Sequence, residues 1–329
     1  MNAPVPVSKP PLLRAEHLVK HFPVERGLFA RGDAAVHAVD GVSFSLAAGE
    51  TMALVGESGC GKSTLGRLLL RLLDATSGKL WFDGVDLMGL SDQEMRVRRR
   101  DLQMIFQDPY SSLNPRMTVA QTLTEPLNLH GLATGRRRER AAELLDLVGL
   151  SAHYLQRYPH EFSGGQRQRI GIARALAVEP RLIVCDEAVS ALDVSIQAQI
   201  INLLKELQAE MGLALIFIAH DLAVVKHISK RIMVMYLGHE MEVAEKNTLY
   251  LQPRHPYTKA LLSAIPIPDP QRERSKVIQL LHGDLPSPIN PPSGCVFRTR
   301  CPQAVARCAQ EVPPLRTLSA ESQAACLLA

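Results

Sequence analysis

Short apolar runs alternate with longer amphipathic stretches from about Leu12 to Met241. Three apolar runs are predicted to be buried strands, at Thr51–Val55, Leu182–Cys185 and Leu215–Ala219. Runs of this kind, without alternating polar residues, are typical of a parallel sheet that is covered on both faces. The pattern therefore predicts a layered α/β core with a largely parallel sheet, which binds its ligands at the carboxyl ends of the strands.

Two parts of the chain depart from this alternation. Residues of about 95–165 contain arginine-rich amphipathic segments such as Arg136–Val148, which predict a helical insertion. Beyond Pro253, closely spaced prolines make long helices unfavourable. We therefore expect a main domain over residues 1–255 and a small irregular module, rich in proline and cysteine, over residues 256–329.

Composition and charge narrow the class of protein only a little. With 329 residues, 46% of them hydrophobic, the chain can bury a sizeable core. Its net charge of +4 is too weak to indicate nucleic-acid binding. No uncharged apolar run reaches the roughly 18 residues that a membrane span needs, and the first residues lack the apolar core of a secretory signal. We expect a soluble cytosolic chain.

A glycine-rich segment directly follows the predicted strand Thr51–Val55 and precedes the helix-like Leu65–Leu73. Its spacing is that of a P-loop, whose backbone N–H groups turn inward around phosphate oxygens at a helix N-terminus. Lys62 is expected to reach the β- and γ-phosphates, and Ser63 to offer a hydroxyl to Mg²⁺. A flexible glycine turn is the alternative, and the strand and helix on either side argue against it. The expected nucleotide contacts are Gly56, Glu57, Ser58, Gly59, Cys60, Gly61, Lys62, Ser63 and Thr64.

Polar residues also follow the two other predicted strands. Asp186 and Glu187 come directly after one of them, where Asp186 could hold Mg²⁺ through water and Glu187 could polarise an attacking water. His220 follows the other and could sense the γ-phosphate. Gln107 could contact Mg²⁺ or the water and link the site to the helical insertion. Each residue alone has an ordinary structural interpretation, and only their combination with a P-loop indicates catalysis.

The segment Phe162–Arg169 resembles the signature of the ABC family, with Phe162 where leucine is commonest. Ser163 and the amides that follow it would form a second anion site at a helix N-terminus. In the ABC family such a site closes over ATP that the P-loop of another subunit holds, so the resemblance implies a head-to-tail dimer. The contacts expected from this segment are Ser163, Gly164, Gly165 and Gln166.

The resemblance extends to two further positions. Asp193 ends the segment Ser190–Asp193, which is similar to the D-loop that communicates across the dimer. Phe22 occupies the place of the aromatic residue that stacks on adenine, although an ordinary core phenylalanine is the alternative. The fold implied is a P-loop NTPase of ABC type, with a RecA-like parallel-sheet core, an antiparallel β subdomain and a helical insertion.

Three outlying motifs narrow the family. Gln107–Arg116, Pro253–Thr258 and Leu285–Pro288 resemble signatures of the dipeptide/oligopeptide importer ATPases, and the whole chain is most similar to the second ATPase subunit of the bacterial dipeptide permease. Nickel importers share much of the pattern and remain an alternative. One departure is Ala188, where proline is usual after the glutamate; alanine frees the local backbone and leaves the chemistry available.

The resemblance also implies partners and a location. The implied partners are a second ABC ATPase subunit, two membrane-spanning permease subunits, and a periplasmic or extracellular peptide-binding protein. The resemblance favours a paralogue as the second ATPase subunit. The chain would lie peripherally on the cytoplasmic face of the bacterial inner membrane and hydrolyse ATP to power peptide uptake. Two rival interpretations are a soluble ABC ATPase acting on nucleic acid and a regulatory subunit that binds ATP without hydrolysing it.

Cysteines crowd the C-terminal segment, where they offer soft thiolate ligands to a metal centre. Arg298, Arg300 and Arg307 are expected to lower the pKa of these thiols. The spacing lacks the Cys-x2-Cys knuckles usual for structural zinc, and the resemblance favours a [4Fe–4S] cluster over zinc or unligated thiols. Cys60 and Cys185, by contrast, are expected to be small packing residues. The four expected cluster ligands are Cys295, Cys301, Cys308 and Cys326.

Overall fold

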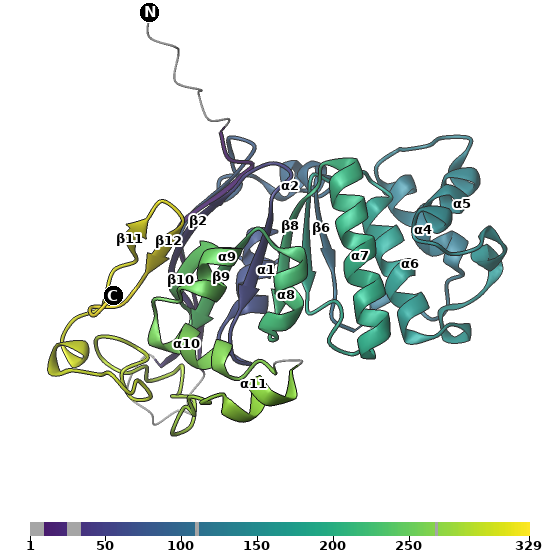
Figure 1. Cartoon of the computed structure of the whole chain (residues 1–329). Helices are drawn as coiled ribbons and strands as arrows, with labels where there is room; N and C mark the ends of the chain where they lie inside the picture. The colour runs from purple at the N-terminus through teal and green to yellow at the C-terminus, as the bar shows by residue number, and fades with distance from the viewer. Residues whose placement is uncertain (1–9, 25–33, 109–111, 267–268) are drawn as a thin grey trace, which may run out of the picture.

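The protein is described by a computed structural model that covers residues 10–24, 34–108, 112–266 and 269–329 (Figure 1). Pro109–Ser111, part of one outlying motif, therefore lie outside the described residues. The described strands form two sheets, one of eight strands and one of four.

The eight-stranded sheet has the order β11-β12-β10-β9-β3-β8-β7-β6. The five strands from β9 to β6 are parallel, and the three beyond β9 are antiparallel. Every residue of β3, β7 and β8 is buried, which confirms the three strands predicted from apolar runs. The strands are β3 (Thr51–Val55), β6 (Leu102–Ile105), β7 (Leu182–Asp186), β8 (Ala214–Ala219), β9 (Arg231–Tyr236), β10 (His239–Glu245), β11 (Arg316–Ser319) and β12 (Ser322–Ala324).

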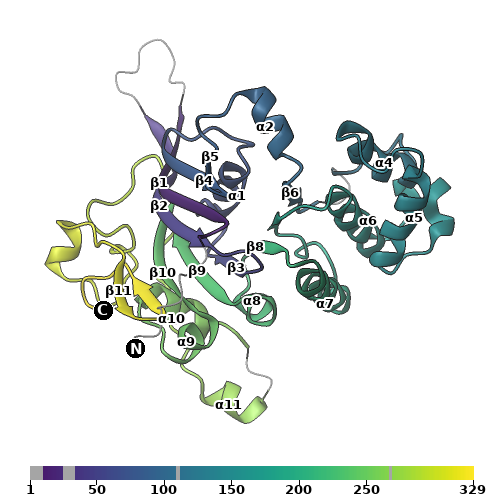
Figure 2. The same cartoon turned by 90° about the horizontal axis from the view of Figure 1, so that it is seen from above.

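The four-stranded sheet is antiparallel and has the order β2-β1-β4-β5. Its inward residues, such as Leu13 and Leu18, share a buried cluster with Leu54 of β3 and Leu65 of α1. Figure 2 shows this sheet on the same side of the parallel sheet as α1. The strands are β1 (Leu13–Pro23), β2 (Ala35–Leu46), β4 (Ser77–Phe82) and β5 (Val85–Asp86).

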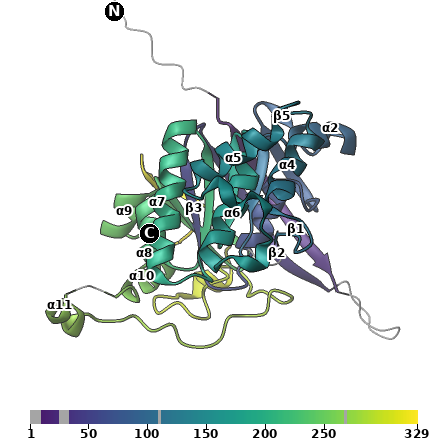
Figure 3. The same cartoon turned by 90° about the vertical axis from the view of Figure 1, so that its right-hand side faces the viewer.

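The predicted helical insertion is present and lies apart from the antiparallel sheet (Figures 1 and 2), and in Figure 3 its helices face the viewer. An apolar stripe on α4, which includes Val119 and Leu123, packs against Leu144 of α5 and Ile170 of α6. The helices are α1 (Lys62–Leu69), α2 (Asp92–Arg98), α4 (Val119–Leu129), α5 (Arg137–Leu147), α6 (Gly164–Leu176), α7 (Val194–Met211), α8 (Leu222–Ile228), α9 (Lys246–Leu251), α10 (Pro256–Ser263) and α11 (Pro270–Ser275). No helix in the described part of the chain has both the length and the apolar character needed to span a bilayer.

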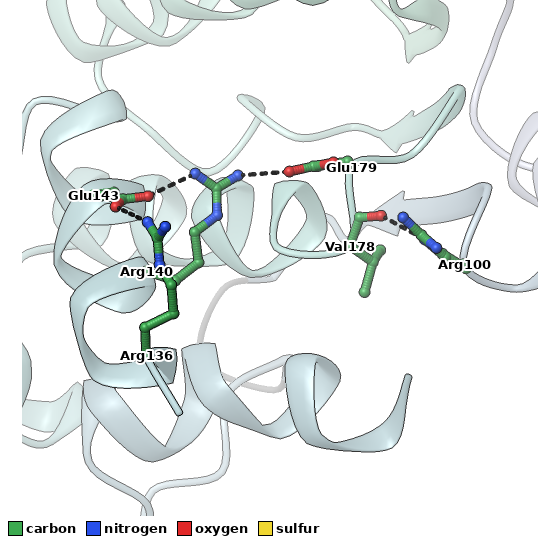
Figure 4. Close-up of polar contacts among 6 residues, drawn as sticks. All are labelled: Arg100, Arg136, Arg140, Glu143, Val178 and Glu179. Atoms are coloured by element: carbon green, nitrogen blue, oxygen red, sulfur yellow. Dashed lines mark hydrogen bonds and ion pairs between the residues drawn. The ribbon is translucent and has the colours of Figure 1, made fainter. Parts of the chain in front are cut away.

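The arginines of the insertion pair with neighbouring acids at the surface (Figure 4). Arg140 donates to Glu143 at 2.9 Å and to Glu179 at 3.1 Å, while Arg136 donates to Glu143 at 2.7 Å. Glu179 follows α6, so Arg140 ties α5 to the segment that leads back to the sheet. Exposed pairs of this type contribute little to stability, because water and salt screen them.

The C-terminal segment is less separate than expected. Residues 276–315 contain little regular structure, as predicted, but β11 and β12 form a hairpin that pairs with β10 and so extends the main sheet. The rings of Tyr236, Tyr257 and Phe297 lie 4.9 to 5.3 Å apart, and these contacts cross the expected boundary between residues 255 and 256. The C-terminal segment therefore packs on the sheet through a shared aromatic cluster.

Candidate nucleotide-binding site

The glycine-rich segment forms a tight loop between β3 and α1. Gly56 and Gly61 have φ angles of 155° and 102°, which side chains rarely adopt. A Cβ at Gly56 would collide with the carbonyl oxygen of Met235, and one at Gly61 with that of Ala38. Both positions therefore need glycine for the close approach of the loop to neighbouring backbone.

Lys62 lies inside this loop and is only 4% exposed. Its ammonium donates to the carbonyl oxygens of Gly56 at 2.8 Å and Glu57 at 2.9 Å. These acceptors are neutral, whereas a phosphate oxygen is charged and accepts a stronger, charge-assisted hydrogen bond. The loop thus holds a cation where a phosphate would bind.

The ends of β3, β7 and β8 bring the other polar residues together. The Ser63 hydroxyl donates to Asp186 Oδ1 at 2.6 Å, and Gln107 Nε2 donates to Glu187 Oε2 at 2.9 Å. His220 Nδ1 lies 4.0 Å from the same Glu187 oxygen. Glu187 has a φ of 45°, a left-handed conformation that is strained for a residue with a side chain and that occurs often at functional sites.

A cleft of about 370 Å³ is lined by Ser63, Gln107 and Glu187 from this group, whereas Asp186 does not line it. Phe22 and Val36 of the antiparallel sheet form one side, and the P-loop forms another. His220 lines a small neighbouring pocket with Glu187 instead. The residues that line the cleft are Phe22, Val36, Ala38, Ser58, Gly59, Gly61, Lys62, Ser63, Thr64, Gln107, Glu187 and Pro288; Gly56, Glu57 and Cys60, also expected to contact nucleotide, are not among them.

The signature segment does not line this cleft. Ser163 caps α6 through a capping box, because its hydroxyl accepts from the Gln166 amide and the Gln166 side chain accepts from the Ser163 amide. Gly165 lies so close to Ile196 of α7 that a Cβ there would be 2.6 Å from Ile196 Cγ2. Phe162, in the place of leucine, is buried and makes an edge-to-face contact with Tyr154.

Asp193 is the N-cap of α7. Its Oδ1 accepts from the Ser195 hydroxyl at 2.7 Å and from the Ile196 amide at 3.0 Å, and these hydrogen bonds lower the pKa of the Asp193 carboxyl. The charge therefore stays at the start of α7, next to the signature helix.

Sequence comparisons now identify the family. A profile described as ABC transporter matches residues 39–190, and one for the C-terminal region of oligopeptide/dipeptide transporters matches residues 241–308. The oligopeptide transport ATP-binding protein OppF of Salmonella typhimurium is 58% identical over 96% of this chain and 95% of its own. The putative oligopeptide transport ATP-binding protein YkfD of Bacillus subtilis is 56% identical over 97% of this chain and 95% of its own. The chain belongs to the oligopeptide/dipeptide family of ABC transporter ATPases.

Solved structures agree with this assignment. The dimeric structure of MJ0796, a bacterial ABC transporter cassette, has a TM-score of 0.63 at 29% identity, over 71% of this chain and 98% of the cassette. Part of the ABC transporter complex cbiONQ, cbiO1 of Clostridium perfringens, also has a TM-score of 0.63, at 27% identity over 74% of this chain and 91% of its own. The protein is thus an ABC-type ATP hydrolase, which confirms the predicted P-loop fold with an antiparallel sheet.

Several contacts of this ABC ATPase were not predicted. The P-loop residue Glu57 donates its backbone N–H to the Tyr257 hydroxyl at 3.0 Å, and its carboxylate accepts from Arg300 at 2.8 Å. Pro288 lines the ATP cleft and accepts from the backbone of His37. Tyr257 and Pro288 belong to the outlying motifs, but no local pattern indicates that they meet the P-loop.

The arginines of the C-terminal segment do not act as predicted. Burial raises the pKa of Cys295 and Cys301, and the neighbouring thiols raise it further. Arg300 is engaged with Glu57, and Arg307 with Glu311. For Cys295 and Cys301 the pKa is therefore raised, and not lowered as predicted, because burial dominates and Arg300 and Arg307 pair with carboxylates.

The two remaining cysteines are packing residues, as predicted. Cys60 and Cys185 are buried, and desolvation raises the pKa of Cys185 to about 12. All six cysteines are free thiols.

Proposed function

We propose that this ATPase binds MgATP in the cleft above the P-loop and hydrolyses it to power the uptake of dipeptides or oligopeptides. The observation that carries the proposal is the meeting of Lys62, the Ser63–Asp186 pair and the Gln107–Glu187 pair at one edge of the sheet. OppF and YkfD, the two sequence relatives described above, are both named for oligopeptide transport. Their names favour a peptide over nickel as the transported substrate.

Each residue has a distinct role in this proposal. Lys62 and the amides of the P-loop bind the phosphates, and Phe22 stacks on the adenine. Ser63, Asp186 and Gln107 would hold Mg²⁺, which supplies positive charge to the β- and γ-phosphates. Glu187 orients and polarises the attacking water, while His220 reaches toward the γ-phosphate from the adjacent strand.

The signature segment would contact ATP that is bound by a second ABC ATPase subunit. The family resemblance favours a paralogue as this subunit. Ser163, Gly164, Gly165 and Gln166 lie away from this chain's own cleft, and Asp193 lies next to them at the start of α7. A closed head-to-tail dimer places such a surface over the partner's ATP. Hydrolysis then reopens the dimer.

Two permease subunits and a periplasmic or extracellular peptide-binding protein complete the proposed importer, with this subunit on the cytoplasmic face of the bacterial inner membrane. A groove of about 390 Å³ between the end of α1 and the insertion supports a permease contact. Leu72, Phe106 and Leu129 line it and are exposed. Phe106 precedes Gln107, and Gln107 donates to Glu187. A displacement of Phe106 by the permease would therefore be transmitted to Glu187 through Gln107.

Glu187→Gln in this chain alone tests the catalytic assignment. We expect ATP turnover at this subunit's site to fall about 10²- to 10⁴-fold, because the general base is lost while ATP binding is retained. Turnover of the assembled complex, stimulated by a series of di- and oligopeptides, is the measurement. Glu210→Gln, at an exposed position of α7, is the matched control. An unchanged rate in the Glu187 variant would show that this glutamate is dispensable.

We also propose that Cys295, Cys301, Cys308 and Cys326 hold a [4Fe–4S] cluster that stabilises the C-terminal segment. A tetrahedral zinc site needs sulfur atoms about 3.8 Å apart. Among the described residues, no three of these thiols come within 4.8 Å of one another, although their charges interact. Thiolates that ligate four different irons lie farther apart than those of a zinc site, so a cluster does not need so tight a group. The Leu328 amide donates to Cys326 Sγ at 3.4 Å, a contact that favours a thiolate.

Anaerobic purification followed by visible absorbance and iron and zinc analysis tests this cluster. We expect broad absorbance at the blue end of the visible spectrum and about four irons per chain. Cys308→Ser should remove both signals, whereas Cys185→Ser should retain them. Stoichiometric zinc without iron would contradict the proposal.

A further inference from the structure

Imidazole and carboxylate groups gather on the antiparallel sheet, outside the nucleotide cleft. His21 of β1 and His37 of β2 are directly opposite each other in the strand register, and their ring centroids are 3.9 Å apart. Asp40 lies beside both rings, and His239, at the start of β10, approaches Asp40 from the other sheet. The ATP-binding residues of the proposed function do not include any of these four side chains.

The distances within this cluster are not those of a simple hydrogen-bond network. His37 Nδ1 lies 3.2 Å from Asp40 Oδ2, but His21 Nε2 lies 3.5 Å from Asp40 Oδ1, beyond the usual limit of about 3.2 Å for an N–H···O bond. His21 Nε2 is buried and has no hydrogen-bond partner among the described residues. Ligand atoms around a tetrahedral ion, each about 2.0 to 2.1 Å from the metal, are about 3.3 Å apart.

We propose that His21, His37 and Asp40 bind one divalent transition-metal ion of the Zn²⁺ class. Their three ligand atoms lie within 4.8 Å of one another. Two imidazoles and one carboxylate suit Zn²⁺ and its first-row neighbours, whereas Mg²⁺ and Ca²⁺ prefer sites made only of oxygen ligands. Three protein ligands leave a fourth position for water.

His239 is the outer partner of this site. Its Nε2 lies 3.9 Å from Asp40 Oδ2. Partners of this kind orient a ligating carboxylate, and their loss weakens metal binding about 10- to 100-fold. Asp40 and His239 line a cavity of about 510 Å³ between the antiparallel sheet and the C-terminal segment, which gives an ion a path from solvent.

The ion would act as a clip between β1 and β2. Phe22 and Ala38, the sequence neighbours of His21 and His37, line the nucleotide cleft. Adjacent residues of a strand point to opposite faces, so the metal site and the adenine side of the cleft share the same two strands. Metal binding should therefore raise the thermal unfolding midpoint, and this stabilisation is a readout that does not depend on ATP hydrolysis.

Co²⁺ and Zn²⁺ titrations of the full chain test the site. Co²⁺ bound by imidazole and carboxylate gives visible d–d bands without the near-ultraviolet charge-transfer band of Co²⁺ bound by thiolate, so the spectrum separates this site from the four cysteines. His21→Gln is the informative variant, since the unpartnered Nε2 leaves no hydrogen bond to lose. His17→Gln is the matched control, because His17 lines the same cavity but lies outside the cluster.

We expect the wild type and His17→Gln to bind one Co²⁺ with the imidazole-type spectrum and to gain thermal stability from Zn²⁺. His21→Gln should bind at least about 100-fold more weakly and gain none, and His239→Gln should bind about 10- to 100-fold more weakly. Equal affinity of the wild type and His21→Gln would overturn the proposal, as would a spectrum that shows thiolate ligation alone. Unfolding midpoints in a chelator show whether each variant is folded. If His21→Gln is not, His37→Asn decides by the same two readouts.

Discussion

The P-loop and the signature segment both contain glycines and both precede a helix, yet the chain supports them in different ways. The P-loop is held from inside: Lys62 donates to its carbonyls, and Glu57 is fixed by Tyr257 and Arg300 of the C-terminal segment. In the described part of the chain, the Ser163 side chain is engaged within its own helix, through the capping box with Gln166. The chain thus supplies its own contacts to the P-loop, whereas the signature segment fits the proposed role toward a partner subunit.

The P-loop and the helical insertion that contains the signature segment also differ in the ion pairs that connect them to neighbouring parts of the chain. Arg300 is only 10% exposed where it meets Glu57, whereas the Arg140–Glu179 pair of the insertion is exposed at the surface. Surface pairs contribute little, and the energy of a buried contact is lost when it separates. This difference in burial favours a rigid connection between the P-loop and the C-terminal segment. It also favours an insertion that can rotate when the proposed dimer closes.

The largest expected effect is the loss of ATP affinity when the P-loop is changed. Lys62→Met removes the buried cation of the P-loop and should weaken ATP binding by more than about 100-fold, since each charged hydrogen bond contributes about 1.5–3 kcal/mol. Titration with a fluorescent ATP analogue measures the affinity. Lys205→Met, at an exposed position of α7, should bind as the wild type does. Retained affinity in Lys62→Met would remove the basis of the comparison.

The second prediction concerns the pH dependence of stability and rests on the buried carboxyl of Glu240 in β10. This carboxyl accepts from the Ser43 amide at 2.6 Å, its other oxygen is buried without a partner in the described part of the chain, and burial raises its pKa from 4.5 to about 7. The folded state therefore holds a proton that the unfolded state has released, so stability falls as pH rises from about 4.5 to 7. The loss should be on the order of 3 kcal/mol.

Glu240→Gln should abolish this part of the pH dependence. Burial lowers the pKa of His255 to about 4, which makes stability rise with pH in an overlapping range. The difference between wild type and variant therefore isolates Glu240. Urea unfolding at pH 5 and pH 8 supplies the numbers, and parallel stability curves for the two proteins would refute the shifted carboxyl.

A smaller effect is expected from the contact between the C-terminal segment and the P-loop. Arg300→Met leaves the Glu57 carboxylate without its cation and should cost about 1–2 kcal/mol, less than the roughly 3–5 kcal/mol of a fully buried pair because Glu57 is partly exposed. ATP affinity should fall several-fold in the same variant. Arg307→Met breaks an exposed pair with Glu311 and serves as the control. Equal effects of the two would show that Arg300 does not position the P-loop.

The smallest effect is expected at the signature segment. Ser163→Ala removes the N-cap of α6 and should cost about 1 kcal/mol of stability. ATP binding by the isolated chain should be unchanged, since Ser163 does not line its cleft. Turnover of the assembled complex should nevertheless fall. A loss of ATP affinity in the isolated chain would mean that the signature segment serves its own subunit.

The sequence predicted those features that depend on near neighbours. The strand at Thr51–Val55 and the loop after it follow from a continuous apolar run and from glycine spacing. The pairing of Ser322–Ala324 with β10 was not predicted, because three residues carry no periodic pattern. The partner of Arg300 lies 243 positions away, so a single sequence gives no sign that it pairs with Glu57 rather than with a thiol.

The hairpin at the end of the chain has a consequence for solubility. β12 pairs with the side of β10 that β9 leaves free. A chain that ended before Arg316 would expose this row of N–H and C=O groups beside the apolar residues of β10. Open edges of this kind recruit strands from other molecules. We therefore expect that a version truncated before Arg316 would precipitate before it lost the ability to bind ATP, because it would exchange the short edge strand β11 for the longer, more apolar edge of β10.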